Sequence, residues 1–126
     1  MIRSEGTTDK APTPVGPYSQ SVRVGNIVAA AGQAGVDPAT GAVASTEVAG
    51  QTIQTFKNIE AVLAASGATL DDVFRVDVYL SDLADFAAMN EQYAKVFTPP
   101  YPARTTVGVQ LPTGLKVEIT ALAMTE

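Results

Sequence analysis

Apolar residues recur at every third or fourth position in two stretches of the chain, which predicts amphipathic helices at about residues 46–66 and 83–97. Gly67 suits the position just after the first helix, and the prolines from Pro99 onwards end the second one. The apolar stripe expected on the first helix consists of Ala49, Ile53, Phe56, Ile59 and Leu63. Such a stripe is typical of a helix that packs on a sheet.

Alternation of apolar and polar residues predicts the strands of that sheet. Strands are expected at residues 18–24, 27–31, 73–80, 104–109 and 115–124, with a short one at 42–43. The first two strands form a β-hairpin around a two-residue turn, Gly25-Asn26. Residues 1–13 carry no periodicity and are expected to be an irregular segment.

The predicted order of elements is β-β-(β)-α-β-α-β-β. It describes a single α+β domain over residues 1–126, with two helices packed on one face of a mixed sheet. Two helices cannot cover both faces. The strand at 115–124 is largely apolar on both sides, so the face away from the helices is expected to be covered by other copies of the chain. The sequence therefore predicts a homo-oligomer.

The composition narrows the chemistry that is available. The net charge is −5 and only eight Lys and Arg are present, which argues against a nucleic-acid partner held by its phosphates. No stretch approaches the roughly 20 apolar residues that cross a bilayer, so we expect no membrane association and a cytoplasmic protein. Cys and His are absent, which removes thiol nucleophiles and the usual general base. We predict no metal site, because adjacent acids such as Asp71-Asp72 at a turn are more often a solvated cap.

The stretch from Pro99 to Val109 places Arg104 between a stiff, proline-rich loop and a strand. A guanidinium that is always charged needs an acidic side chain or a bound anion as its partner. If the strands at 104–109 and 115–124 pair as a hairpin, Glu118 lies beside Arg104. Two interpretations remain open: a cross-strand ion pair, or an anion clamp beside a carboxylate that positions or deprotonates water.

Four other positions have an ordinary structural interpretation beside a functional one. Tyr18 follows a turn and is either a packed edge aromatic or a group that lines a site. Asn90 has the default interpretation of a solvent-facing helix residue. Gly32 marks a bulge, or offers unpaired backbone groups to a ligand. Thr106 follows another threonine, and both are good strand formers. None of these positions indicates a function alone.

Considered together, these stretches resemble the reactive-intermediate deaminase family, also called Rid or YjgF-like. The resemblance covers nearly the whole chain and is carried by Gly16-Pro17-Tyr18-Ser19-Gln20, Gly32-Gln33 with Asp37-Pro38-Ala39-Thr40-Gly41, Asn90 with Tyr93, Pro102-Ala103-Arg104, and Lys116-Val117-Glu118-Ile119. It implies a chorismate-mutase-like fold, a homotrimer whose sheets form a central barrel, and a ligand site in each cleft between subunits.

Family members with the arginine hydrolyse 2-imino acids, or enamine tautomers of the 2-aminoacrylate type, to 2-keto acids and ammonia. The resemblance therefore implies a deaminase of the 2-iminobutyrate/2-iminopropanoate type. Arg104 would hold the substrate carboxylate, for which a planar two-pronged donor is well suited. Glu118 would orient or activate the attacking water. No cofactor is expected, because a protonated imine is already electrophilic.

The resemblance assigns supporting roles to further residues. Tyr18 and Asn90 would line the cleft, and backbone groups near Gly32 and Thr106 would hold polar atoms of the substrate. The chain departs from the family at Ala31, where serine is usual, and at Thr106, where cysteine is usual, so its rate and substrate preference are open. The alternative function is a non-catalytic protein that binds or senses a small carboxylate, such as a 2-keto acid, in the same cleft.

Overall fold

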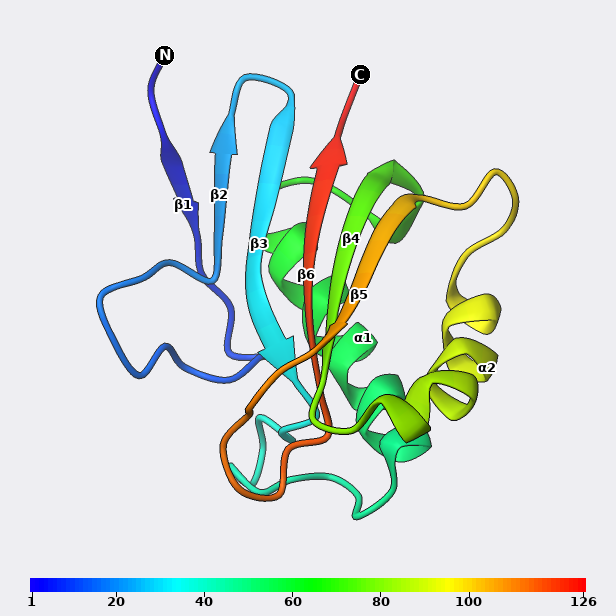
Figure 1. Cartoon of the computed structure of the whole chain (residues 1–126). Helices are drawn as coiled ribbons and strands as arrows, with labels where there is room; N and C mark the ends of the chain where they lie inside the picture. Colours follow the sequence, from blue (N-terminus) through cyan, green and yellow to red (C-terminus); the bar gives the residue numbers. More distant parts are fainter.

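The computed structural model describes residues 1–126 and consists of one six-stranded mixed sheet with helices on one face (Figure 1). The strands are β1 (Ser4–Gly6), β2 (Ser21–Val24), β3 (Ile27–Ala34), β4 (Val73–Leu80), β5 (Ala103–Gly108) and β6 (Val117–Met124). The helices are α1 (Val48–Ala65) and α2 (Phe86–Val96), with short 3-10 turns η1 (Leu70–Asp72) before β4 and η2 (Leu83–Asp85) before α2.

The strand order across the sheet is β1-β2-β3-β6-β4-β5. Every neighbouring pair is antiparallel except β4 and β5, which are parallel because α2 carries the chain back to the starting edge of β4. The hairpin expected between the strand of Arg104 and the strand of Glu118 is wrong, because β4 lies between β5 and β6. Strand order depends on pairing between distant segments, which a local alternation does not specify.

Most of the predicted elements are confirmed, with shifted ends. Gly25 turns the β2–β3 hairpin with φ +58, and Gly67 follows α1 with φ +81. The N-terminal segment is not wholly irregular, since β1 pairs with β2. The short strand expected at 42–43 is reduced to a single bridge between Val36 and Val43.

The core lies between the sheet and α1. Val76 and Val78 of β4 and Ile119 of β6 are fully buried beneath Ile59 and other residues of the helix. The predicted stripe is wrong at Ile53, which is 45% exposed. Four polar side chains of α1 are buried instead, and each donates to backbone carbonyls. Gln51 and Asn58 bond to loops and to the end of β3. Thr52 and Thr55 bond to the preceding turn of the helix itself.

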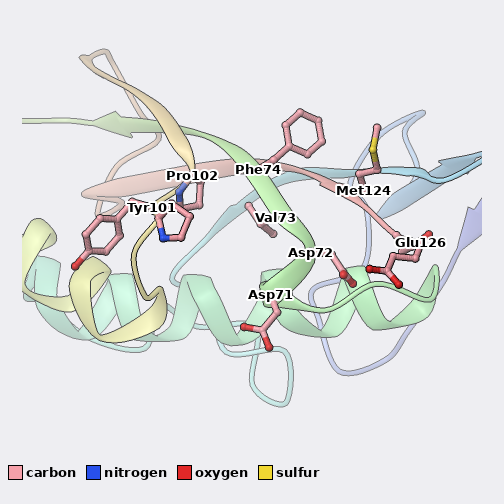
Figure 2. A pocket seen from close by; sticks show the side chains of 10 residues that line it. Asp71, Asp72, Val73, Phe74, Tyr101, Pro102, Met124 and Glu126 are labelled. Carbon is pink, nitrogen blue, oxygen red and sulfur yellow. The ribbon is translucent and has the colours of Figure 1, made fainter.

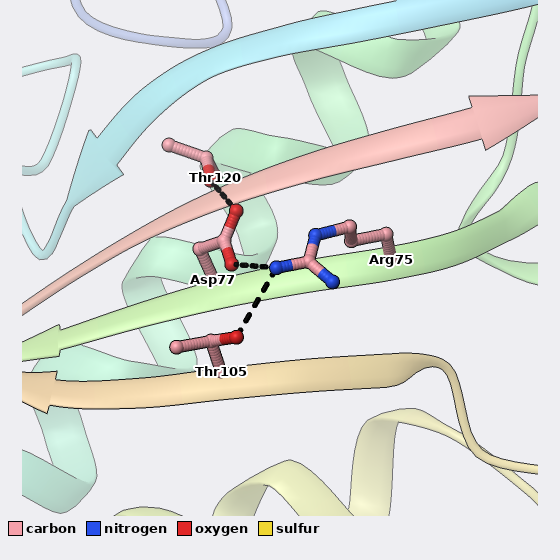
Figure 3. Close-up of polar contacts among 4 residues, drawn as sticks. All are labelled: Arg75, Asp77, Thr105 and Thr120. Atoms are coloured by element: carbon pink, nitrogen blue, oxygen red, sulfur yellow. Dashed lines mark hydrogen bonds and ion pairs between the residues drawn. The ribbon is translucent and has the colours of Figure 1, made fainter.

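The opposite face of the sheet carries no helix. Near its centre, Arg75 forms an ion pair of 2.9 Å with Asp77 and donates a hydrogen bond to Thr105 (Figure 3). Around this polar group lie large apolar side chains that remain exposed, among them Ile27 (42%), Val107 (39%) and Met124 (52%). The face that the helices leave open is therefore part polar and part apolar.

Neither helix is long and apolar enough to cross a membrane.

Candidate functional site

Arg104 lies near the start of β5, directly after the proline-rich loop that follows α2. Its register with Val76 places its side chain on the helix-covered face of the sheet. There the guanidinium carbon lies 4.6 Å from the centroid of the Tyr93 ring and 5.5 Å from that of Phe86. The one ion pair between side chains joins Arg75 and Asp77, so Arg104 has no acidic partner.

A cavity of about 320 Å³ opens beside this guanidinium. Its lining consists of Asn90, Tyr93, Ala94, Tyr101, Pro102 and Arg104. Helix α2 supplies the first three residues, and the proline-rich loop and the start of β5 supply the rest. The structure thus brings the predicted residues Arg104 and Asn90 to one cavity. Aromatic and aliphatic walls around one unpaired cation favour a small anion with an apolar body.

Two hydroxyl groups are buried without a hydrogen-bond partner: the Oη atom of Tyr93, a residue that lines this cavity, and the Oγ1 atom of Thr106. Thr106 lies two residues after Arg104 on the same side of β5, in register with Val78. Burial raises the pKa of the Tyr93 phenol above its ordinary value, and the smaller effect of the Arg104 charge lowers it. The phenol is therefore neutral at physiological pH and is a donor with nothing to donate to.

The sequence analysis gave Phe86 and Tyr93 no role beside Arg104, although Tyr93 belongs to one of the stretches that carry the family resemblance. The signal for such a role is their spacing: Phe86, Asn90 and Tyr93 are four and three residues apart, which places them on one side of α2. That spacing equally suits core packing, which Tyr93 also provides through its contacts with Phe56 and Phe97. The role beside Arg104 becomes visible only in the structure, where β5, which carries Arg104, lies beneath this side of the helix.

Glu118 lies on the other face of the sheet. Its register partners are Tyr79 of β4 and Ala34 of β3, whereas its neighbour in the chain, Ile119, is fully buried beneath α1. The carboxylate is half-buried and has no ion pair. Within one chain, Arg104 and Glu118 therefore cannot contact the same small ligand, and the expectation that they lie side by side is wrong for a single copy.

The remaining predicted residues fall near Glu118 or apart from both centres. Ala31 and Gly32 form a bulge in β3 where the register with β6 shifts, and Gly32 lies against Glu118. The backbone N–H of Ala31 donates to the carbonyl of Gln20. Tyr18 is 49% exposed in the loop before β2, with its hydroxyl 3.4 Å from the N–H of Val15.

A larger cavity, of about 620 Å³, lies where β4 begins and β6 ends (Figure 2). Asp71, Asp72 and Glu126 lie on one side of it, and Phe74 and Met124 line another part. Asp72 accepts a hydrogen bond from the N–H of Thr69, as expected for a cap, and no group of three or more carboxylates is arranged to hold a metal ion. The three acidic residues make this larger cavity unfavourable for an anion. The cavity of Arg104 is therefore the better candidate for a carboxylate ligand.

Comparisons with known proteins find one family, whose members match this chain along almost its whole length. The Endoribonuclease L-PSP family matches residues 8–125. A RutC family protein of Pyrococcus abyssi is 47% identical over 120 residues, which are 94% of each chain. A Dermatophagoides farinae protein named 2-iminobutanoate/2-iminopropanoate deaminase is 40% identical over 95% of this chain and 94% of its own. The crystal structure of E. coli TdcF with bound serine has a TM-score of 0.91 at 36% identity, over 98% of this chain and 99% of that one.

Proposed function

Because the chain belongs to the Endoribonuclease L-PSP family, the family of the reactive-intermediate deaminases, we propose that it hydrolyses small 2-imino acids to 2-keto acids and ammonia. The α+β, chorismate-mutase-like fold expected from the sequence is confirmed and is shared with solved structures of relatives. The substrate class rests on the name of the Dermatophagoides farinae relative and on the chemistry of the Arg104 cavity.

The observation that carries the proposal is the unpaired guanidinium of Arg104. The guanidinium carbon lies over two aromatic rings, 4.6 Å from the centroid of Tyr93 and 5.5 Å from that of Phe86, and the group has no acidic partner. A guanidinium that is fixed in this way matches the two oxygens of a carboxylate. Arg104 does not form the cross-strand ion pair with Glu118 within one chain, because Glu118 lies on the other face of the sheet.

The reaction needs only water and one base. A water molecule attacks C2 of the protonated imine while Glu118 accepts one of its protons, and a tetrahedral carbinolamine forms. Glu118 then returns that proton to the amino nitrogen. The C2–N bond breaks, ammonia leaves with the bonding electrons, and the hydroxyl passes its proton to Glu118 to become the keto oxygen. Ammonia then takes up this proton, so the products are the 2-keto acid and ammonium. Arg104 holds the carboxylate throughout, so the electrophilic carbon stays in place.

This scheme requires a second copy of the chain, because Arg104 and Glu118 lie on opposite faces of one sheet. In the homotrimer that we propose, the open face of one copy brings Glu118 to the Arg104 cavity of its neighbour. The exposed apolar side chains Ile27, Val107 and Met124 on that face support burial against another copy. Asn90 belongs to the half of the site with Arg104, and Gly32 to the half with Glu118.

Two positions bear on rate and selectivity. Ala31 supplies no hydroxyl to the bulge beside Glu118, so any polar contact there must come from the backbone. Thr106 buries its hydroxyl without a partner, and rotation of its side chain would turn that group towards a ligand. Tyr18, which is half-exposed, is available to close the cleft from its loop.

A non-catalytic function in the same cleft is the second candidate. It is favoured by the serine bound to E. coli TdcF, since serine has a carboxylate but no imine. Such a protein would bind 2-keto acids through Arg104 and would turn nothing over. Ribonuclease activity, which the family description names, is not favoured here, because the chain has no His and a net charge of −5.

The deciding experiment supplies 2-iminobutanoate from threonine with a threonine dehydratase and measures the release of 2-ketobutyrate. The protein is expected to accelerate the release, and Arg104→Ala to lower kcat/KM at least about 100-fold, because a charge-assisted, two-pronged contact is lost. Arg3→Ala is the matched control, since Arg3 is exposed at the N-terminus and should be neutral. Absence of acceleration by the wild-type protein contradicts the deaminase, and Arg104-dependent binding of 2-ketobutyrate would then support the second candidate.

A further inference from the structure

Gly32 occupies an unusual position in β3, at the bulge opposite β6. Ala30 pairs with Ala121 and Gln33 with Ile119, so Ala31 and Gly32 together face the single residue Thr120. The backbone of Gly32 does not have a positive φ, and the residue is exposed. Neither a left-handed conformation nor tight packing of the strand explains why this position carries no side chain.

The surroundings of a side chain at position 32 supply the explanation. A Cβ atom added there would lie 2.8 Å from Oε2 of Glu118, 3.2 Å from its Cδ and 3.4 Å from its Cγ, and these are the three nearest heavy atoms. The contrast with Gly35 is informative, because a Cβ there would lie 2.7 Å from the backbone Cα of Gln51. A side chain at Gly35 would displace a helix, whereas one at Gly32 would displace only the end of a flexible carboxylate.

We propose that Gly32 is a positioning residue for the hydrolysis. By lacking a side chain, it leaves the space against β3 in which the carboxylate of Glu118 rests. This inference depends on the proposed function, in which Glu118 handles the attacking water. The inference goes beyond that function because it names the bulge at Ala31 and Gly32 as the feature that determines where this carboxylate lies. Bulges frequently re-aim side chains beside active sites, and here the extra residue also removes the neighbouring Cβ.

The structure sets the size of the expected effect. To accept a methyl group on Gly32, Oε2 must retreat from 2.8 Å to an ordinary contact of about 3.4 Å, a shift of about 0.6 Å. A misplacement of about 1 Å in a reacting group is enough to lower a rate about 100-fold. Gly32→Ala should therefore lower kcat about 10-fold or more. Binding of the substrate carboxylate should stay within about 2-fold of wild type, because the three nearest heavy atoms to the added methyl group all belong to Glu118, and in the proposed site the carboxylate is held by Arg104 of the neighbouring copy.

The test compares wild type, Gly32→Ala, Glu118→Asp and the double variant in the coupled 2-iminobutanoate assay, with 2-ketobutyrate binding measured by calorimetry. The Asp side chain is one methylene shorter, so its carboxylate oxygens reach only about as far as Cδ of Glu118, and the nearest contact, with Oε2 at 2.8 Å, is lost. Gly32→Ala should therefore cost less than about 2-fold in the Glu118→Asp background. Equal costs in both backgrounds, or full activity of Gly32→Ala, would overturn the inference. So would a parallel loss of 2-ketobutyrate binding, because Gly32 would then contact the ligand itself.

Crystal structures of wild type and Gly32→Ala give a readout that does not depend on activity. We expect the Glu118 carboxylate to move by at least about 0.6 Å while β3 and β6 stay in place. An unmoved carboxylate or a displaced β3 would contradict the positioning role even if the wild-type protein proved inactive. An inactive wild type with a displaced carboxylate would leave the geometry correct and the deaminase proposal wrong, so the two failures are distinguishable.

Discussion

Replacing Tyr93 by phenylalanine should make the protein more stable, although it removes a polar group from the candidate site. The side chain is 5% exposed, and its hydroxyl has no hydrogen-bond partner. The ring is retained in Phe, so the edge contacts with Phe56 (centroids 5.8 Å apart) and the stacking on Arg104 (4.6 Å) persist. The substitution therefore isolates the free energy of one unpaired hydroxyl.

The expected gain follows from the cost of burying that group. A buried hydroxyl without a partner costs about 1–3 kcal/mol relative to its hydrated state in the unfolded chain. Tyr93→Phe should raise the free energy of unfolding by about 1–2 kcal/mol, which for a chain of this length is a rise of roughly 3–8 °C in Tm. Tyr93→Leu is expected to lower it by about 2–4 kcal/mol, because two aromatic contacts and the cation–π contact are lost.

Urea unfolding followed by circular dichroism, at one fixed protein concentration, measures these differences from midpoints at constant slope. Tyr101→Phe is the matched control: Tyr101 lines the same cavity but is 51% exposed, so the change in its free energy of unfolding should stay within about 0.5 kcal/mol. A lower stability of Tyr93→Phe would refute the reasoning, since it would show that the hydroxyl has a bonding partner in the assembled protein.

Two further predictions concern pH and the attachment of α1. Burial raises the pKa of the Tyr93 phenol above its ordinary value of 10.0, so as the pH rises the unfolded chain loses this proton before the folded one does. The free energy of unfolding of the wild type should therefore be unaffected by this group below pH 10 and should fall as the pH rises towards the folded pKa. The advantage of Tyr93→Phe should therefore grow between pH 8 and pH 11 in the same urea assay, and a constant difference would contradict the shift. Asn58→Ala should lower stability by about 2–3 kcal/mol, because its buried amide donates to the carbonyls of Ala34 and Val36 at 3.0 and 2.9 Å. A change below about 0.5 kcal/mol in urea unfolding would show that water replaces both bonds.

Several parts of the fold follow from local patterns. The two helices, the hairpin around Gly25 and the end of α1 at Gly67 depend on contacts within a few residues, and the structure confirms them. Ile53 shows the limit of such patterns. Its spacing fits the stripe, but the groove between the helices leaves it exposed, while Asn58 is buried because its amide bonds to the end of β3.

The candidate site divides in the same way. Arg104 was identifiable because a charged residue after a rigid loop requires a partner, and Asn90 reached its cavity because helical spacing places it beside Tyr93. The wrong expectation was the pairing of Arg104 with Glu118. It assumed that strands consecutive in the chain are neighbours in the sheet, and β4 takes that place through long-range pairing.

By itself, the sequence determined the two helices and the five longer strands, the proline-rich loop before Arg104 and the presence of a sheet face that two helices cannot cover. The alternation of apolar and polar residues along a strand shows which of its side chains lie on the same face. It does not show which face of one strand matches which face of another. That relation comes from strand order and register, which depend on contacts between segments far apart in the chain. Only the tertiary structure therefore decided that Arg104 lies under α2, that Glu118 lies on the open face, and that Gly32 rests against its carboxylate.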